Sequence, residues 1–223
     1  MEHLFSGIEG PERESLLGCL QAVRRQYKKG ELVFAAGDAP AVGLLHSGAV
    51  QVLAEDPMGN RTIIGRMEAG DIFGEAFACA GAEKMPFSVE AVSDSEVMLI
   101  DVKRILGTCP TACPFHSQLI ENLMSILARK NIMLGSKIRH LSRRTTRDKL
   151  LSYLTEKARE AGARSFTIPF NRQELADFLC VDRSAMSSEL SKLRNEGVLD
   201  FEKNEFCFLR RPKGPARANN PAI

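Results

Sequence analysis

The sequence predicts an α+β protein in which a β-barrel is followed by a long helix and by a group of short helices with a β-hairpin. Glycines separate short apolar segments throughout residues 28–105, which is typical of an antiparallel barrel or sandwich. Residues 115–141 contain one glycine, no proline and apolar residues at helical spacing. Residues 171–209 contain two short helical patterns around a tight turn and then a β-type pair. A chain of 223 residues has room for one large or two small domains.

The composition is that of an ordinary globular protein. Hydrophobic residues make up 44% of the chain and charged residues 26%. No run approaches the ~18 apolar residues of a membrane-spanning helix, and the first residues lack the basic and then apolar pattern of a signal peptide. Six scattered cysteines do not match a secreted disulfide scaffold. We therefore expect a cytoplasmic protein with reduced thiols and no membrane partner.

Charge is distributed unevenly along the chain. Residues 1–136 contain 12 basic and 17 acidic side chains, whereas residues 137–223 contain 18 basic and 11 acidic ones. An acidic first part and a basic last part suggest a sensory or structural module joined to a module that binds a polyanion. Nucleic acid is the first candidate for that polyanion.

The expected β-rich domain spans residues 1–110. Residues 44–46 and 50–53 are β-type runs, and residues 56–60 contain the Asp, Pro, Gly and Asn typical of a hairpin loop. Residues 11–26 have a helical pattern. The glycines that divide this domain stand at positions 30, 37, 43, 48, 59, 65, 70, 74 and 81.

The helix expected at residues 115–141 carries a coiled-coil pattern. Steps of four and three residues, held for three heptads, connect one seam of residues in which one member is polar. An Asn in such a seam is known to fix register and two-strand association, so we expect a homodimer helix over residues 111–142. The alternative is an amphipathic helix that packs on its own barrel. The seam consists of Ile120, Met124, Leu127, Asn131, Leu134, Ile138 and Leu141.

Residues 143–223 are expected to form a winged helix-turn-helix. A helix is predicted near residues 148–161. Asn171 and Glu174 form a capping-box pattern at the start of another short helix, and Asp182 is a good N-cap for the helix at residues 183–196. Gly197 ends that helix. Residues 198–209 are β-type with a turn near Lys203, which predicts a hairpin wing.

The second helix of this motif has one face suited to contact with base edges. Met186, Leu190 and Leu193 share its inward face, while an arginine and small hydroxyl residues share the opposite face. Such side chains approach bases closely and form hydrogen bonds, whereas a helix that only faces solvent more often carries Glu and Lys there. The expected base contacts are Arg183, Ser184, Ser187 and Ser188, and the expected phosphate contacts are Arg172 and Lys192.

Taken in this order, the motifs resemble the Crp/Fnr family, the regulators related to the cyclic-AMP receptor protein and the fumarate-nitrate-reduction regulator. Residues 44–52 resemble the barrel hairpin before the ligand site, residues 70–75 resemble the entry to the phosphate-binding cassette, and residues 181–187 resemble the DNA-reading helix. The resemblance implies a cyclic-nucleotide-binding-like jelly roll, a dimerisation helix and a winged helix-turn-helix. It also implies as partners double-stranded DNA with a palindromic operator, a second copy of the chain, a small-molecule effector and, as a further candidate, RNA polymerase.

The sequence departs from this family in the effector pocket. The resemblance places the pocket at Gly74, Glu75, Ala76, Met85, Pro86 and Phe87. Members that bind cyclic nucleotides have Arg-Ser where this chain has Met85 and Pro86, and a buried phosphate without a cationic partner costs several kcal/mol. Lys84 is an adjacent alternative cation, although a lysine at a shifted position is a point charge rather than a bidentate fork. We expect an effector other than cyclic AMP, and no cofactor is identified.

One group of two cysteines and a histidine leaves redox or metal sensing open as an alternative, although it is not the favoured interpretation. Cys19 alone lies near the N-terminus, so the cysteine cluster of the iron-sulfur branch is not expected. Cys109, Cys113 and His116 have spacing that would suit a soft metal, a haem iron or a thiol pair, but three ligands do not close a tetrahedral site, and inert thiols are the favoured interpretation.

The predicted function is therefore a dimeric, sequence-specific DNA-binding transcription regulator that an effector in the barrel controls. The alternative is a small-molecule binding protein with a degenerate DNA-binding domain. An enzyme is not expected, because none of the four histidines lies in a nucleophile–base arrangement and no Gly-rich phosphate loop is present.

Overall fold

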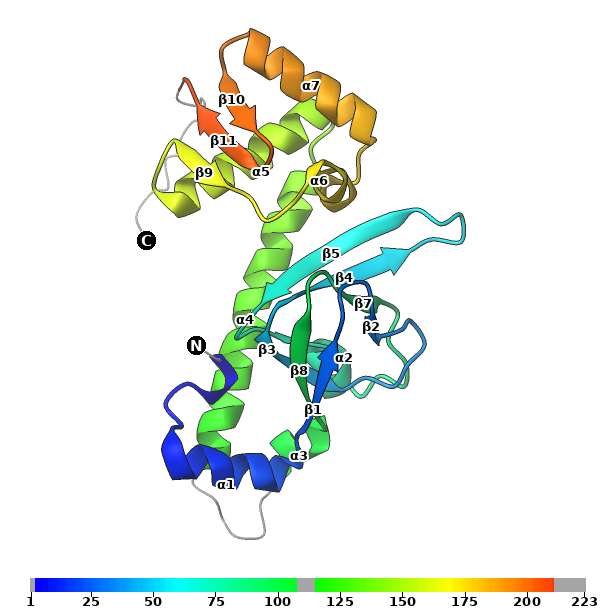
Figure 1. The fold of residues 1–223 in the computed structure, drawn as a ribbon, viewed down its shortest axis with the longest axis vertical. Helices are drawn as coiled ribbons and strands as arrows, with labels where there is room; N and C mark the ends of the chain where they lie inside the picture. Colours follow the sequence, from blue (N-terminus) through cyan, green and yellow to red (C-terminus); the bar gives the residue numbers. More distant parts are fainter. Residues whose placement is uncertain (1–2, 108–114, 211–223) are drawn as a thin grey trace, which may run out of the picture. The chain divides into compact units, whose positions relative to one another are not determined.

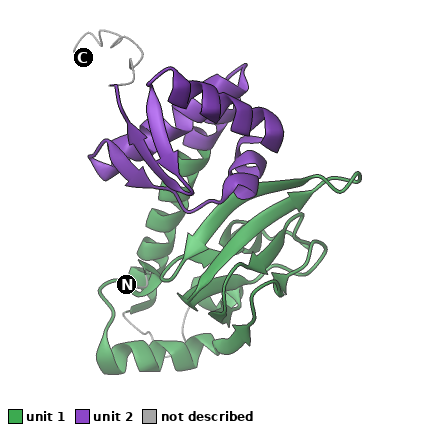
Figure 2. Ribbon diagram, turned by 45° about the horizontal axis from the view of Figure 1, so that its top comes forward, with its two compact units in different colours: residues 1–134 green, residues 135–223 purple. Residues whose placement is uncertain are grey.

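A computed structural model describes residues 3–107 and 115–210, which form two compact units (Figures 1 and 2). The first unit comprises residues 1–134 and the second residues 135–223, and the boundary lies within the long helix α4 (Phe115–Leu141). The bounds of α4 confirm the predicted helix. Within the described ranges, no helix combines the length and the apolar character needed to cross a membrane.

The first unit contains two four-stranded antiparallel sheets with the strand orders β1-β8-β3-β6 and β2-β7-β4-β5, which confirms the predicted jelly-roll barrel. Its strands are β1 (Val23–Tyr27), β2 (Leu32–Phe34), β3 (Val42–Ser47), β4 (Ala49–Glu55), β5 (Arg61–Glu68), β6 (Ile72–Phe73), β7 (Ser88–Ala91) and β8 (Ser95–Ile100). Its short helices are η1 (His3–Phe5), α1 (Gly10–Leu20), α2 (Glu75–Cys79) and α3 (Val102–Leu106).

The connection between β3 and β4 differs from the hairpin that residues 44–52 suggest. β3 and β4 belong to different sheets and do not pair. Gly48 between them has φ 86°, and a Cβ there would lie 2.3 Å from Ser95 Oγ and 2.4 Å from the carbonyl oxygen of Asp94. Only glycine fits this turn, which takes the chain from one sheet to the other. The hairpin predicted around residues 56–60 is confirmed between β4 and β5.

The helix predicted for residues 11–26 is too long. The helix α1 ends at Leu20, and Gln21 follows in the left-handed conformation with φ 47°. Residues 23–27 form β1, each residue of which pairs with β8. Pairing with a distant strand therefore overrides the helical pattern of this segment.

One face of α4 packs on the barrel. Leu119, Leu123 and Ile126 are buried in a cluster with residues of α1, β3, β6 and β8. A second cluster, which includes Phe34, Phe73 and Val89, fills the space between the two sheets. The alternative interpretation of α4 as an amphipathic helix on its own barrel thus holds for one of its faces.

The second unit is a helix-turn-helix, as predicted, and the predicted hairpin of β10 and β11 is extended by β9 to a three-stranded wing in the order β10-β11-β9. Thr145 caps α5 through the backbone N–H of Asp148, so α5 begins two residues before the predicted start. Asn171 and Glu174 form the predicted capping box, and Asp182 accepts the backbone N–H of Ala185. The elements after α4 are α5 (Thr146–Ala161), β9 (Ser165–Thr167), α6 (Arg172–Leu179), α7 (Arg183–Asn195), β10 (Leu199–Glu202) and β11 (Glu205–Phe208).

Candidate nucleic-acid interface and effector pocket

The helix α7 separates a buried face from an exposed one, as its sequence predicts. Its buried face carries Met186, Leu190 and Leu193, which are at most 1% exposed and pack α7 against the rest of the second unit. Arg183 and Ser188 lie on the exposed face. Within the described part of the chain, Arg183 makes no ion pair, so its guanidinium is available to a ligand.

The serines of α7 present hydrogen-bond acceptors outward. The hydroxyl of Ser184 donates to Asp182 Oδ1 at 2.5 Å, that of Ser187 to the carbonyl oxygen of Arg183 at 2.9 Å, and that of Ser191 to the carbonyl oxygen of Ser187 at 3.0 Å. Each Oγ keeps lone pairs that can accept a hydrogen bond. The exposed face of α7 therefore combines the guanidinium of Arg183, which donates hydrogen bonds, with serine hydroxyl oxygens, which accept them. Both kinds of group can bind the edges of base pairs.

Arg172, one of the two expected phosphate contacts, stacks on aromatic rings and stays partly exposed. Its guanidinium lies 4.6 Å from the ring centre of Phe201 and 5.1 Å from that of Phe206, on the wing. Burial, with a smaller effect from Arg194, lowers the pKa of Arg172. Arg172 thus packs α6 against the wing. Lys192 remains exposed and binds Glu189 at 2.6 Å.

Arg147 positions α7, a role that the sequence did not reveal. It donates to Glu196 Oε1 at 2.8 Å and to Glu196 Oε2, and it lies 4.0 Å from Glu189. The hydrogen bond to Glu196 raises the pKa of Arg147. The basic residues at 143–147 indicate that this segment binds an anionic group. They do not identify that group, because Glu196, the partner of Arg147, lies 49 positions away in the sequence.

In the expected effector pocket, a lysine of α4 holds Glu75. Gly74 adopts φ 78°, and a Cβ there would lie 2.3 Å from the carbonyl oxygen of Ala41, so only glycine fits before α2. Glu75 is 3% exposed, and Lys130 Nζ donates to its Oε1 at 2.8 Å and to the carbonyl oxygen of Ile72 at 2.5 Å. Glu75 Oε2 is buried without a hydrogen-bond partner among the described residues.

The other residues expected in the pocket differ in their surroundings. Met85 is 2% exposed and belongs to the apolar cluster between the sheets. Ala76 and Pro86 are exposed, and Phe87 packs edge-on against Phe77 with a ring separation of 5.6 Å. The cation next to Glu75 is therefore supplied by α4, and Lys84 is exposed on the surface.

The predicted seam of α4 is not uniform. Leu127 is partly buried against the barrel cluster, so only part of its side chain is open to a second copy of the chain. Ile120 and Leu141 are also partly buried, while Asn131 is exposed. The exposed apolar side chains of α4 include two, Ile132 and Met133, that the seam did not contain. Those side chains, with their exposed fractions, are Met124 65%, Ile132 73%, Met133 66%, Leu134 48% and Ile138 66%.

The cysteine pair of the sequence analysis, Cys109 and Cys113, lies outside the described residues. His116 is 9% exposed, and its Nε2 lies 3.3 Å from the carbonyl oxygen of Arg104. In residues 3–107 and 115–210, no group of three His, Cys, Asp or Glu side chains is placed to hold a metal ion.

Models of two known protein domains match this chain, one in each unit. The model of the cyclic nucleotide-binding domain matches residues 24–111, and that of the Crp-like helix-turn-helix domain matches residues 148–213. The nitrogen fixation regulation protein FixK of Azorhizobium caulinodans is 29% identical over 184 residues, covering 77% of this chain and 68% of FixK. A probable transcriptional activator of Rhizobium leguminosarum is 26% identical over 191 residues, covering 81% of this chain and 75% of the activator.

Solved structures share the fold. The c-di-GMP responsive global regulator CLP of Xanthomonas campestris matches with a TM-score of 0.74 and 20% identity, covering 90% of this chain and 99% of CLP. FixK2 of Bradyrhizobium japonicum matches with a TM-score of 0.66 and 23% identity, covering 85% and 93%. With both family models in the same order as the two observed units, the chain belongs to the Crp/Fnr family of effector-controlled, DNA-binding transcription regulators.

Proposed function

We propose that this chain acts as a homodimer that binds a palindromic operator through α7, under the control of an effector other than cyclic AMP. The observation that carries the proposal is the exposed face of α7, where the unpaired Arg183 stands among small hydroxyl side chains. Arg183 reads a guanine through its bidentate fork, and the serine oxygens accept hydrogen bonds from base amino groups. Lys192 supplies a phosphate contact.

The exposed apolar side chains of α4 support the homodimer. Met124, Leu134 and Ile138 lie at positions of the four-three repeat and are about half or more exposed. A second copy of α4 buries them, and Asn131 pairs with its counterpart across the seam. Two copies present two α7 helices to two half-sites, which is the reason that operators of such dimers are palindromic.

The residues near Glu75 argue against cyclic AMP. A bound cyclic phosphate needs a cation and hydrogen-bond donors, but Met85 is packed in the core and Pro86 has no N–H. Lys130 is already bound to Glu75 and to a carbonyl oxygen. The protein acts by binding rather than by catalysis, and RNA polymerase is the further partner that we propose, since several relatives are named as activators.

Selection of DNA sites tests this function. Purified full-length protein is incubated with a library of random duplexes, and the bound duplexes are sequenced over successive rounds. We expect a palindrome with half-sites roughly 34 Å apart, one turn of the duplex. Affinity for it should fall steeply as salt rises, because Lys and Arg displace counterions from the phosphates. Enrichment of no palindromic site would refute the proposal.

A further inference from the structure

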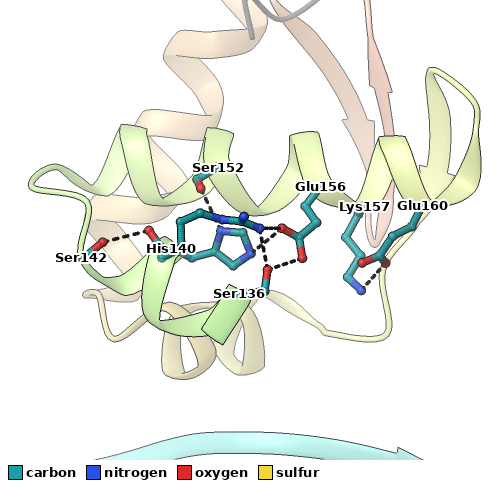
Figure 3. A network of polar contacts seen from close by, with 8 residues as sticks. Ser136, His140, Ser142, Ser152, Glu156, Lys157 and Glu160 are labelled. Atoms are coloured by element: carbon teal, nitrogen blue, oxygen red, sulfur yellow. Dashed lines mark hydrogen bonds and ion pairs between the residues drawn. The ribbon is translucent and has the colours of Figure 1, made fainter. Parts of the chain in front are cut away.

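At the end of α4, three side chains surround the carboxylate of Glu156 on α5 (Figure 3). The Ser136 hydroxyl donates to Glu156 Oε1, and Arg139 Nη2 donates to Glu156 Oε2. His140 Nε2 lies 3.6 Å from Glu156 Oε2. Residues 136, 139 and 140 span about one helical turn, so one side chain of α5 holds one whole turn of α4.

His140 lies at the centre of this junction. It is 3% exposed, its Nδ1 lies 2.8 Å from Ser152 Oγ, and its ring meets that of Tyr153 edge-on at 5.8 Å. Glu156 is itself mostly buried, with 15% of its side chain exposed. The junction therefore keeps an imidazole and a carboxylate largely away from water, where the charge state of each strongly affects packing.

Burial lowers the pKa of His140, and the nearby Glu156 carboxylate opposes this effect. The cations Arg139 on α4, Arg143 in the connection and Lys157 on α5 lower the pKa further. Burial thus favours the neutral form of His140 in the packed junction. Because a protonated His140 is disfavoured there, the junction is fully stable above about pH 6.5 and weakens as pH falls below it.

We propose that Glu156 is a positioning residue, which clamps the last turns of α4 to α5, and that protonation of His140 releases this clamp. The proposal rests on the function proposed above, since α4 carries the dimer surface and α5 carries Arg147, which holds α7. While the contacts of Glu156 with α4 are intact, a shift in the position of α4 moves α5 with it. Once the clamp opens, the two helices move independently and operator binding weakens.

The chain offers a matched control for Glu156. Glu160 lies one turn later on the same helix, and its side chain is 51% exposed, with an ion pair to Lys157 at 2.7 Å. The variants Glu156→Gln and Glu160→Gln make the same chemical change inside and outside the junction. His140→Gln removes the titrating group, and His140 is the single histidine of residues 135–223.

The first measurement is the affinity of full-length protein for the selected operator at pH 7.5 and 5.5, at one ionic strength. We expect the wild-type protein and Glu160→Gln to lose at least tenfold in affinity at pH 5.5, and His140→Gln to lose less than threefold. Glu156→Gln should bind about tenfold more weakly than wild type already at pH 7.5. Wild-type affinity in Glu156→Gln, or an unchanged acid loss in His140→Gln, would overturn the proposal.

The second measurement is amide hydrogen exchange without DNA at pH 7.5. The N–H of Ser142 donates to the carbonyl oxygen of Ile138 at 2.9 Å at the end of α4. We expect this amide and its neighbours to exchange at least tenfold faster in Glu156→Gln, with the amides of α7 unchanged. Unchanged exchange at 138–142, or equal acceleration in α7, refutes the clamp. If the wild-type protein binds no operator at all, the proposed function is refuted. The hydrogen-exchange comparison still tests whether Glu156 holds the end of α4 against α5.

Discussion

Replacing Lys137 with methionine should stabilise the second unit. Lys137 lies near the end of α4 and is 9% exposed, with its Nζ 4.3 Å from the centre of the Phe178 ring. Burial lowers its pKa from 10.5 to about 8, while the nearby Cys180 acts in the opposite direction. At pH 7 the side chain is still largely protonated, so the fold holds a buried ammonium group.

The size of the effect follows from the pKa. A difference between 10.5 and about 8, at about 1.4 kcal/mol per pKa unit, means that burying the charged form costs about 3.5 kcal/mol. Methionine has a similar length and no charge, but it loses the interaction with the ring of Phe178, worth about 1 kcal/mol. We therefore expect the free energy of unfolding at pH 7 to rise by about 2.5 kcal/mol in Lys137→Met.

The pH dependence gives a second check. Because the pKa of Lys137 is lower in the folded state, the unfolded chain binds this proton at higher pH. Wild-type stability should therefore fall as pH drops from about 10.5 to about 8 and then stay level with respect to this group. The advantage of Lys137→Met should be constant below about pH 8 and should shrink markedly by pH 10.

Intrinsic fluorescence can follow this unit alone. The chain has two tyrosines and no tryptophan, so in a Tyr27→Phe background Tyr153 of α5 reports the second unit. Urea unfolding is compared at pH 7 and pH 10 for that background, for Lys137→Met and for the control Lys192→Met, whose lysine is 58% exposed. The control should change stability by less than about 0.5 kcal/mol. Equal or lower stability of Lys137→Met at pH 7 would refute the reasoning.

Three further outcomes are expected. Arg183→Ala should weaken operator binding by about 1–3 kcal/mol and relax specificity at one base pair per half-site. Binding to operators altered at single positions measures both effects. An equal loss of affinity for every operator would indicate a phosphate contact instead. The double variant Leu134→Glu, Ile138→Glu should sediment as a monomer and lose specific binding, whereas a native chain that is monomeric at micromolar concentration would contradict the dimer. Calorimetry with cyclic AMP should detect no binding at micromolar concentration, and tight binding would mean that Lys130 leaves Glu75 to meet the phosphate.

Local patterns in the sequence were sufficient to predict α4 and the helices of the second unit. The capping box of Asn171 and Glu174, the N-cap Asp182 and the four-three repeat of α4 all act within a few residues, so they can be recognised without the fold. The turn at residues 56–60 is equally local. For the same reason, the exposed face of α7 was predicted from the spacing of Met186, Leu190 and Leu193.

The tertiary structure decided the features that depend on partners far away in the sequence. Residues 23–27 are a strand because they pair with β8, some 70 positions later, and the guanidinium of Arg172 lies on the rings of the wing. Lys130 binds Glu75 across 55 positions, and Leu127 packs partly on the barrel cluster. The sequence alone determined the helices from α4 to α7 and the apolar face of α7, because these properties come from neighbouring residues. Which charge meets which carboxylate, and which apolar face stays exposed, depended on long-range packing that brings distant segments together.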